Sequence, residues 1–473
     1  MNEQKIDQFF EEKKDQMIED ILRLIRIPSI VTDVDIKRIH PYGEDAARCV
    51  DEFLLIADRM GFSTKNLDYY AAYADYGEGK RAVDLLAHLD VVAANGDWTV
   101  TQPFSPCIKD GNIYGRGAAD DKGPAIAALY AMYAIKELGI PLKKAVRMVA
   151  GSNEENGGRE DLKHYYDHEQ PAEATISPDA DYPIINVEKG YLRGKVKASY
   201  ATNINRPAII SIDAGTKRFV IPGTASATVK GIPEEKVRNY VNAWSARMGL
   251  KADVGLTGSD NKIQIVVIGT ETHVGAPQRG NNALTGMLDL LCGLMDGENN
   301  GALEQLRTLH KVFPHGDYTG KAAGIARKTE DSGELYCTLN IFHYRTESMD
   351  GSFDCKTPMG TTESNSRDIL VKKLKDGGVE VENCIMKAAH YVPTDSKLVQ
   401  TLLKYYEKYT GLQGYGVVID GNTYVYDVEN GVAFGCQMPG IDNCMHLENE
   451  FVRISDLITS AKIYTAAIVE LCS

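Results

Sequence analysis

Histidines and carboxylates close several of the most apolar stretches of this 473-residue chain. The run AVDLLAHLDVV contains His88 and Asp90 at its end, and AVRMVAGSNEE ends with Glu154 and Glu155. Uncompensated charge is expensive to bury, so side chains of this kind at the ends of buried strands need a counterpart. A divalent cation held by nitrogen and oxygen ligands is one such counterpart.

Three further segments supply side chains of the same types. The Gly-rich turn IYGRGAADDKG carries Asp120 and Asp121, ISPDADYP carries Asp179, and MPGIDNCMHLENE carries His446. Each segment alone has an ordinary explanation, such as a capping residue, a turn residue or a solvated loop. Their repeated placement after apolar runs favours a metal site over these separate explanations.

The elements that position these side chains follow from the hydrophobic pattern. Nearly continuous apolar runs at 82–92 and 145–152 flank a small-residue stretch at 123–138, a pattern that predicts strand, helix and strand in an α/β sheet covered on both faces. Such a sheet presents the carboxyl ends of its strands to the ligand crevice. The residues that could bind metal stand at those ends.

The middle of the chain has a different pattern. Residues 191–230 and 261–270 alternate, as half-buried antiparallel strands do, and three helical stretches are interspersed at 233–247, 281–295 and 366–377. We therefore expect a discontinuous α/β catalytic domain with a mixed, mostly parallel sheet, formed by 1–189 and 387–473. An α+β lid domain, 190–386, is expected to be inserted into it. Further helices are predicted before Pro28, at 46–60 and at 456–471.

The charge balance excludes several classes of partner. Lys and Arg number 52 against 66 Asp and Glu, a formal charge of −14 that disfavours nucleic acid and anionic membrane surfaces. No run approaches the roughly 18 apolar residues of a membrane span, and the N-terminus lacks the apolar core of a secretory signal. Nine cysteines without a C-x-x-C pair are typical of reduced thiols. We expect a cytoplasmic protein.

Several strings carry a resemblance to a known family. LLAHLDVV, GDW, IYGRGAADDKGP, SNEE, SPDADYPIINVEKG and a late MH resemble the dinuclear zinc peptidases of the aminoacylase/carnosinase type. Within that family the sequence is most similar to the PepV-type bacterial dipeptidase branch. The resemblance covers most of the expected catalytic domain and is weaker over the inserted domain.

The resemblance implies two divalent metal ions and a ligand set for each. His88 and Asp179 would bind one ion, Glu155 and His446 the other, and Asp120 would bridge the two. Zinc is the expected metal. Manganese and cobalt remain open, because the order of metal affinities does not by itself decide occupancy.

The resemblance also implies roles for residues beside the ligands. Glu154 would be the general base, and Asp90 would orient His88. The Asp120–Asp121 peptide bond would be cis. These roles agree with general chemistry, since two metal ions can share and activate a water and a ligating histidine needs its second ring nitrogen held in place.

The inserted domain matches the family in one place and departs from it in others. VIGTETHVGAPQRGNNA matches the region of a lid histidine, so His273 is expected to polarise the substrate carbonyl. Phe219 and Phe342 stand where the PepV-type enzymes carry the Asn and Arg that bind substrate, and Asp420 stands in a loop that is Gly-rich in them. Arg345 is the substrate-binding candidate. Other cations that could replace the lost ones are Lys217, Arg218 and Arg279.

The resulting hypothesis is a metal-dependent dipeptidase that acts on small peptides, through a water shared by two zinc ions. An N-acyl or N-carbamoyl amino acid amidohydrolase of the same mechanism is the first alternative, with an acyl-amino-acid substrate. A non-catalytic homologue that retains its metals is the second. The inserted segment is long, as in the PepV branch, where an enlarged lid replaces a second subunit, so we expect a monomer.

Overall fold

The computed structural model describes residues 3–257 and 262–473, and the chain divides into two compact units. Unit 1 comprises Met1–Val187, Tyr391–Val417 and Asn422–Ser473, and unit 2 comprises Glu188–His390 and Val418–Gly421. These divisions lie within a few residues of the expected boundaries after 189 and 386. The sequence pattern did not indicate that 418–421 groups with unit 2.

Unit 1 is built on a nine-stranded sheet in which β23 pairs with β9 and the other strands follow the order β1-β2-β6-β3-β7-β24-β9-β22. Its central strands β6, β3, β7 and β24 are parallel neighbours, whereas β1, β2 and β9 pair antiparallel at the edges. The strands are β1 (Ser63–Leu67), β2 (Ala71–Tyr76), β3 (Arg81–His88), β6 (Ala145–Gly151), β7 (Ala174–Ser177), β9 (Ile184–Glu188), β22 (His390–Tyr391), β23 (Gly416–Ile419) and β24 (Gly431–Ala433).

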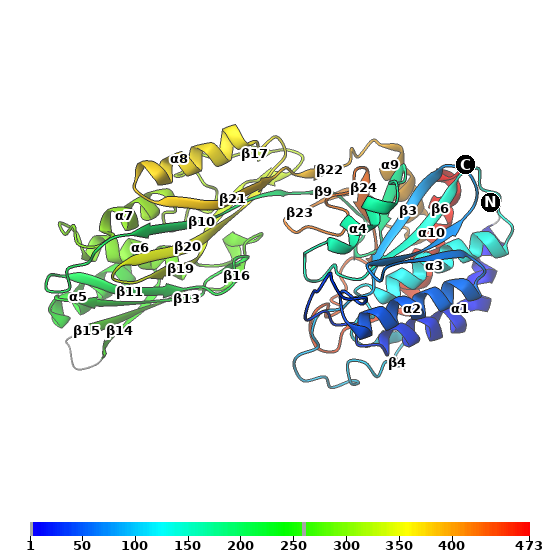
Figure 1. The fold of residues 1–473 in the computed structure, drawn as a ribbon, viewed down its shortest axis with the longest axis horizontal. Coiled ribbons are helices and arrows are strands. Elements are labelled where there is room, and N and C mark those ends of the chain that lie inside the picture. The colour runs from blue at the N-terminus through cyan, green and yellow to red at the C-terminus, as the bar shows by residue number, and fades with distance from the viewer. Residues whose placement is uncertain (1–2, 258–261) are drawn as a thin grey trace. The chain divides into compact units, whose positions relative to one another are not determined.

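Helices cover the sheet of unit 1 (Figure 1). They are α1 (Glu3–Ile25), α2 (Glu44–Arg59), α3 (Lys122–Glu137), α4 (Glu160–His168), α9 (Lys397–Thr410) and α10 (Ile454–Leu471). The alanine-rich α3 is buried along its whole length up to Ile135, because it packs against α1 and α10 as well as the sheet. Smaller pairings join β4 (Cys107–Lys109), β5 (Asn112–Tyr114) and β26 (Phe451–Arg453), and β8 (Ala180–Asp181) with β25 (Cys436–Gln437).

Unit 2 contains an eight-stranded antiparallel sheet in the order β14-β15-β13-β11-β19-β20-β10-β21. The strands are β10 (Gly190–Ser199), β11 (Ala208–Ala214), β13 (Thr224–Lys230), β14 (Lys251–Thr257), β15 (Lys262–Ile268), β19 (Tyr336–Tyr344), β20 (Ser348–Thr357) and β21 (Glu380–Lys387). Short pairings join β12 (Val220–Ile221) to β16 (Thr272–His273) and β17 (Lys328–Thr329) to β18 (Gly333–Glu334).

One face of the sheet of unit 2 packs against four helices around an apolar core (Figure 1). These are α5 (Glu234–Met248), α6 (Ala283–Leu294), α7 (Leu303–Val312) and α8 (Asp368–Asp376). The expected helices correspond to α5, α6 and α8, while α7 was not predicted. The α/β class, with parallel strands at the centre of the first sheet and an α+β second unit, is confirmed. Among the described residues, no helix is long and apolar enough to cross a bilayer.

Candidate metal centre

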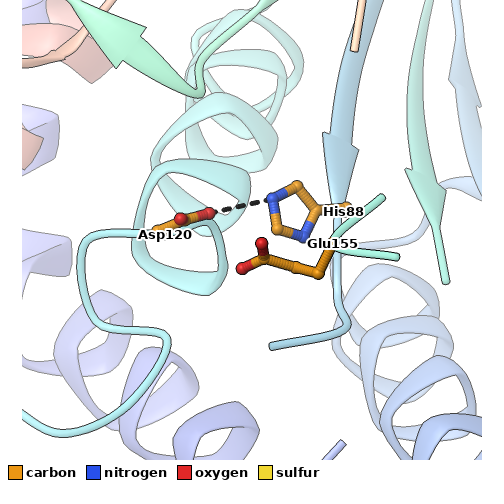
Figure 2. A group of neighbouring side chains, drawn as sticks. All are labelled: His88, Asp120 and Glu155. Carbon is orange, nitrogen blue, oxygen red and sulfur yellow. Dashed lines mark ion pairs between the residues drawn. The ribbon is translucent and has the colours of Figure 1, made fainter. Parts of the chain in front are cut away.

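The chain order of unit 1 brings the sequence-predicted side chains to one edge of its sheet. His88 is the last residue of β3, Glu154 and Glu155 follow β6, and Asp179 follows β7. These three strands are parallel neighbours, so their carboxyl ends meet. Asp120 lies on the turn before α3. Figure 2 shows the side chains of His88, Asp120 and Glu155 gathered at this edge.

Asp120 lies between two imidazoles. Its Oδ1 atom is 2.9 Å from His88 Nε2, and its Oδ2 atom is 2.8 Å from His446 Nε2. Asp179 Oδ2 lies 3.5 Å from the His88 nitrogen, and Glu155 Oε2 lies 3.3 Å from the His446 nitrogen. The five side chains therefore form two groups that share Asp120.

The donor set fits divalent cations. His88 Nε2, Asp120 Oδ1 and Glu155 Oε1 are buried and form no hydrogen bond of acceptable geometry, and ligand atoms of these three residues lie within 4.8 Å of one another. Buried polar atoms normally have partners, so a group of unpaired nitrogen and oxygen atoms that face one another is typical of a site that binds a cation. With Glu154 and Asp179, the four carboxylates carry a charge that two divalent ions would balance.

Asp90 is fully buried and positions three of its neighbours. Its carboxylate accepts hydrogen bonds of 3.0 Å from the backbone amides of Glu154 and Glu155. His88 Nδ1 lies 3.0 Å from the Asp90 carbonyl oxygen and 3.4 Å from its carboxylate. Because β3 ends at His88, Asp90 lies beyond the strand, where one residue contacts both the histidine ring and the two glutamates.

A second buried carboxylate, which the sequence pattern did not indicate, holds the segment after β6. Asp161 accepts hydrogen bonds from the amides of Ser152 and Asn153, at 3.0 and 2.9 Å, and from the hydroxyl of Tyr424. The Tyr424 ring meets the His88 ring edge-on, with centroids 6.1 Å apart. A side-chain carbon at Gly151 would lie 1.7 Å from the Tyr424 hydroxyl oxygen, so this contact requires glycine at that position.

Glu450 was also missed, since an acid four residues after His446 follows no recognisable spacing rule. It is completely buried and accepts from the amides of Gly117, Ala119 and Asp120, at 3.1, 2.9 and 3.3 Å. Its carboxylate also pairs with Arg116. Glu450 therefore fixes the turn that carries Asp120. The Asp120–Asp121 peptide bond is cis, as the resemblance implied.

The charges of the centre shift its protonation. Burial, reinforced by neighbouring carboxylates, raises the pKa of Glu154 to about 8 and the pKa of Glu155 to about 7. Hydrogen bonds to Asp120 and Glu155 raise the pKa of His446 to about 10. Burial opposes ionisation of Asp120, yet the two imidazoles beside its carboxylate hold its pKa below the usual range. Without metal, the centre therefore retains protons that divalent ions would displace.

His273 belongs to unit 2, at the end of β16. Its Nδ1 atom accepts a 3.1 Å hydrogen bond from the Gly275 amide, which leaves the ring proton of the neutral form on Nε2. Burial and the charge of Lys356 lower its pKa and favour that neutral form. Arg345, the other candidate in this unit, forms two hydrogen bonds to the carboxylate of Asp213, at 2.8 and 3.1 Å.

The three departures from the family pattern occupy different environments. Phe342 is fully buried in the core between the sheet and helices of unit 2. Phe219 is 49% exposed, with its ring centroid 6.4 Å from that of His273. Asp420 Oδ1 lies 2.9 Å from Lys189 Nζ, so its charge is paired within unit 2.

Comparisons with known proteins find relatives of this chain. Residues 85–470 match the profile of Peptidase family M20/M25/M40. The Beta-Ala-Xaa dipeptidase of Lactobacillus delbrueckii subsp. lactis is 35% identical over 467 residues, 98% of this chain and 97% of its own. The Bacillus subtilis (strain 168) protein YtjP is 32% identical over 464 residues, 97% of this chain and 98% of its own.

Solved structures share the fold at low sequence identity. Human carnosine dipeptidase 1 aligns with a TM-score of 0.59 at 14% identity, over 100% of this chain and 99% of its own. The di-peptidase Dug1p of Saccharomyces cerevisiae aligns with a TM-score of 0.57 at 13% identity, over 100% and 98%. The family profile covers well over half of the chain, and the two relatives above 30% identity cover nearly all of it. This chain therefore belongs to peptidase family M20/M25/M40 and is a hydrolase of that family.

Proposed function

We propose that this protein is a metal-dependent dipeptidase that hydrolyses small dipeptides with Glu154 as general base. The observation that carries the proposal is the group of His88, Asp120 and Glu155, whose buried ligand atoms face one another without hydrogen-bond partners. The substrate class follows the similarity to the Beta-Ala-Xaa dipeptidase, which extends over 98% of this chain.

Unit 1 would hold two divalent ions, with zinc as the expected metal. His88 and Asp179 would bind one ion, Glu155 and His446 the other, and Asp120 would bind both, in keeping with the two groups that share its carboxylate. When bound, the ions would supply Lewis-acid polarisation of the peptide carbonyl and a lowered pKa for a water that they share.

Glu154 would accept the proton of the attacking water and pass it to the leaving amine. Its backbone amide is held by the Asp90 carboxylate. Bound divalent ions would counter the burial that raises the pKa of Glu154 in the metal-free centre, and so would leave its carboxylate able to accept a proton. Asp90 would act through position alone, because its carboxylate is occupied by two backbone amides.

Unit 2 would act as the lid domain, and unit 1 as the catalytic domain. His273 would donate its Nε2 proton to the carbonyl oxygen where negative charge develops, because its Nδ1 atom is occupied by the Gly275 amide. Arg345 stays a prediction as a substrate ligand, and its pairing with Asp213 would have to open for that role.

The test is hydrolysis of a mixed set of dipeptides and N-acyl amino acids, with the metal content assayed on the same preparation. Dipeptide cleavage that is abolished both by a chelator and by Glu154→Ala would support the proposal. Cleavage of N-acyl amino acids alone would favour an amidohydrolase. Two bound metals without turnover of any substrate would indicate a non-catalytic homologue.

A monomeric state and a cytoplasmic location also remain predictions. The first is checked by light scattering at concentrations used for the assay. A mass near that of one 52.0 kDa chain is expected, and a mass of two chains would contradict it.

A further inference from the structure

His446 stands in unit 1 on a loop without regular secondary structure, residues 438–450, which joins β25 to β26 and is called the histidine loop below. Its side chain is 49% exposed, and its imidazole contacts Asp120 and Glu155, which are themselves predicted metal ligands. The backbone of His446 is left-handed, with φ +64°. A residue with a side chain keeps this conformation when the surrounding structure holds it there, so the position of this ligand depends on what holds the loop.

Asn449 joins the histidine loop to the segment 96–100. Its side-chain oxygen accepts hydrogen bonds from the backbone amides of Thr99 and Val100, at 2.9 and 3.0 Å. The backbone of Asn449 is also left-handed, with φ +60°, a conformation that asparagine adopts more readily than most residues. One side chain, three residues after His446, therefore fixes the loop to a part of unit 1 that is distant in the sequence.

Two further contacts join the same two segments. A side-chain carbon at Gly96, where φ is +86°, would lie 2.1 Å from the Glu448 carboxylate, so glycine leaves the room that Glu448 occupies. The guanidinium of Arg116 lies over the Trp98 ring, 5.4 Å from its centroid, and donates a 3.2 Å hydrogen bond to the Leu447 carbonyl. The string GDW, one of those that carry the family resemblance, therefore forms part of the surface against which the histidine loop packs.

We propose that Asn449 is a positioning residue that holds His446 where it binds its divalent ion. The inference rests on the proposed function, in which His88 belongs to one ion and His446 to the other. Asn449 would act through the histidine loop, because its oxygen is occupied by two backbone amides. Its loss should weaken the ion at His446 and spare the ion at His88, whose ring is held by β3 and by the Asp90 carbonyl.

The test is a calorimetric titration of the metal-free protein with zinc. Asn449→Gly keeps the left-handed backbone accessible and removes the acceptor, so it should lower the affinity of one zinc ion about 10–100-fold and leave the other unchanged. Asn449→Asp, which keeps an acceptor oxygen, should bind both ions with nearly the wild-type affinity. In a protein that already carries His446→Ala, Asn449→Gly should cause no further loss, because the ligand that it positions is absent.

Asn430→Gly is the matched control, because Asn430 also has a positive φ, +54°, and its side chain donates to the carbonyl of Glu173, so both zinc affinities should stay unchanged. Thermal unfolding of each variant separates loss of folding from loss of binding.

Unchanged binding in Asn449→Gly, equal weakening of both ions, an equal loss in Asn449→Asp, or a further loss beside His446→Ala would overturn the inference. Dipeptide hydrolysis by the wild type is measured on the same preparation. Two bound ions without hydrolysis would remove the proposed function and leave the inference intact, whereas fewer than two ions in the wild type would remove both.

Discussion

The two units differ in how the charges of their buried side chains are balanced. The centre of unit 1 gathers carboxylates and two imidazoles whose ligand atoms face one another, and backbone amides hold the supporting acids Asp90 and Asp161 in place. Unit 2 instead pairs its acids with cations: Asp354 lies 2.8 Å from the guanidinium of Arg193, and Asp420 lies 2.9 Å from the ammonium group of Lys189. The first arrangement is suited to divalent cations, whereas the acids of the second have their counter-charges within the unit.

The largest expected effect comes from removing the base of unit 1 while keeping its ligands. Glu154→Gln should lower kcat for dipeptides by about 10²–10⁴-fold, because the amide cannot accept a proton. The metal content, measured by elemental analysis, should not change, since Glu154 is assigned no metal. Substantial activity in this variant would assign the proton transfer to another residue.

The next effect compares a buried and an exposed phenylalanine of unit 2. Phe342→Ala should lower the free energy of unfolding by about 3–5 kcal/mol, because the ring is fully buried against the helices. Phe219→Ala, at a position that is 49% exposed, should cost less than about 1 kcal/mol. Urea unfolding followed by circular dichroism measures both. Equal losses of unfolding free energy in the two variants would contradict the difference in burial between Phe342 and Phe219.

A smaller effect is expected from Asp90, which supports the predicted metal ligands of unit 1 without being one of them. Asp90→Asn should lower metal affinity or activity about 10–100-fold, because one side chain holds the amides of both glutamates and lies against His88. Asp167→Asn, an exposed change on α4, is the control. Metal titration of the two variants is the measurement, and matching affinities would contradict a positioning role for Asp90.

The smallest effect is a pH dependence of the metal-free protein. The pKa of Glu154 rises from 4.5 to about 8, and that of His446 from 6.5 to about 10, so the folded state binds more protons than the unfolded state between these values. Stability should therefore fall as pH rises through this interval. The stabilisation gained on adding metal should grow over the same interval. Thermal unfolding at about pH 6 and about pH 9 tests both signs, and a metal-free Tm that rises with pH would contradict them.

The sequence predicted the residues at the centre of unit 1 more completely than the arrangement of side chains on the sheet of unit 2. His88 and the two glutamates end apolar runs, so periodicity alone placed them at one sheet edge. Asp161 and Glu450 could not be found in this way, because they reach backbone amides from segments distant in the chain or without a regular spacing. The hydrophobic pattern therefore predicted which side chains meet at the sheet edge, but it did not predict Asp161 and Glu450, which hold the neighbouring loops.

In unit 2 the strand register determines which side chains share a face of the sheet, and the sequence alone did not predict it. A register irregularity between Leu339 and Ile341 interrupts the alternation of β19, and Phe342 lies on the side of the helices. Counting residues along the string LNIFHYR therefore does not tell which side chains share a face.

The most direct test of the central claim is the number of metal ions bound by the wild-type protein and by Asp120→Asn, measured by elemental analysis after dialysis against zinc. Asp120 faces both imidazoles, so the account predicts two ions per chain in the wild type and the loss of at least one in the variant, together with loss of dipeptide hydrolysis. Equal metal content in the two proteins, or hydrolysis that survives complete removal of metal, would contradict it.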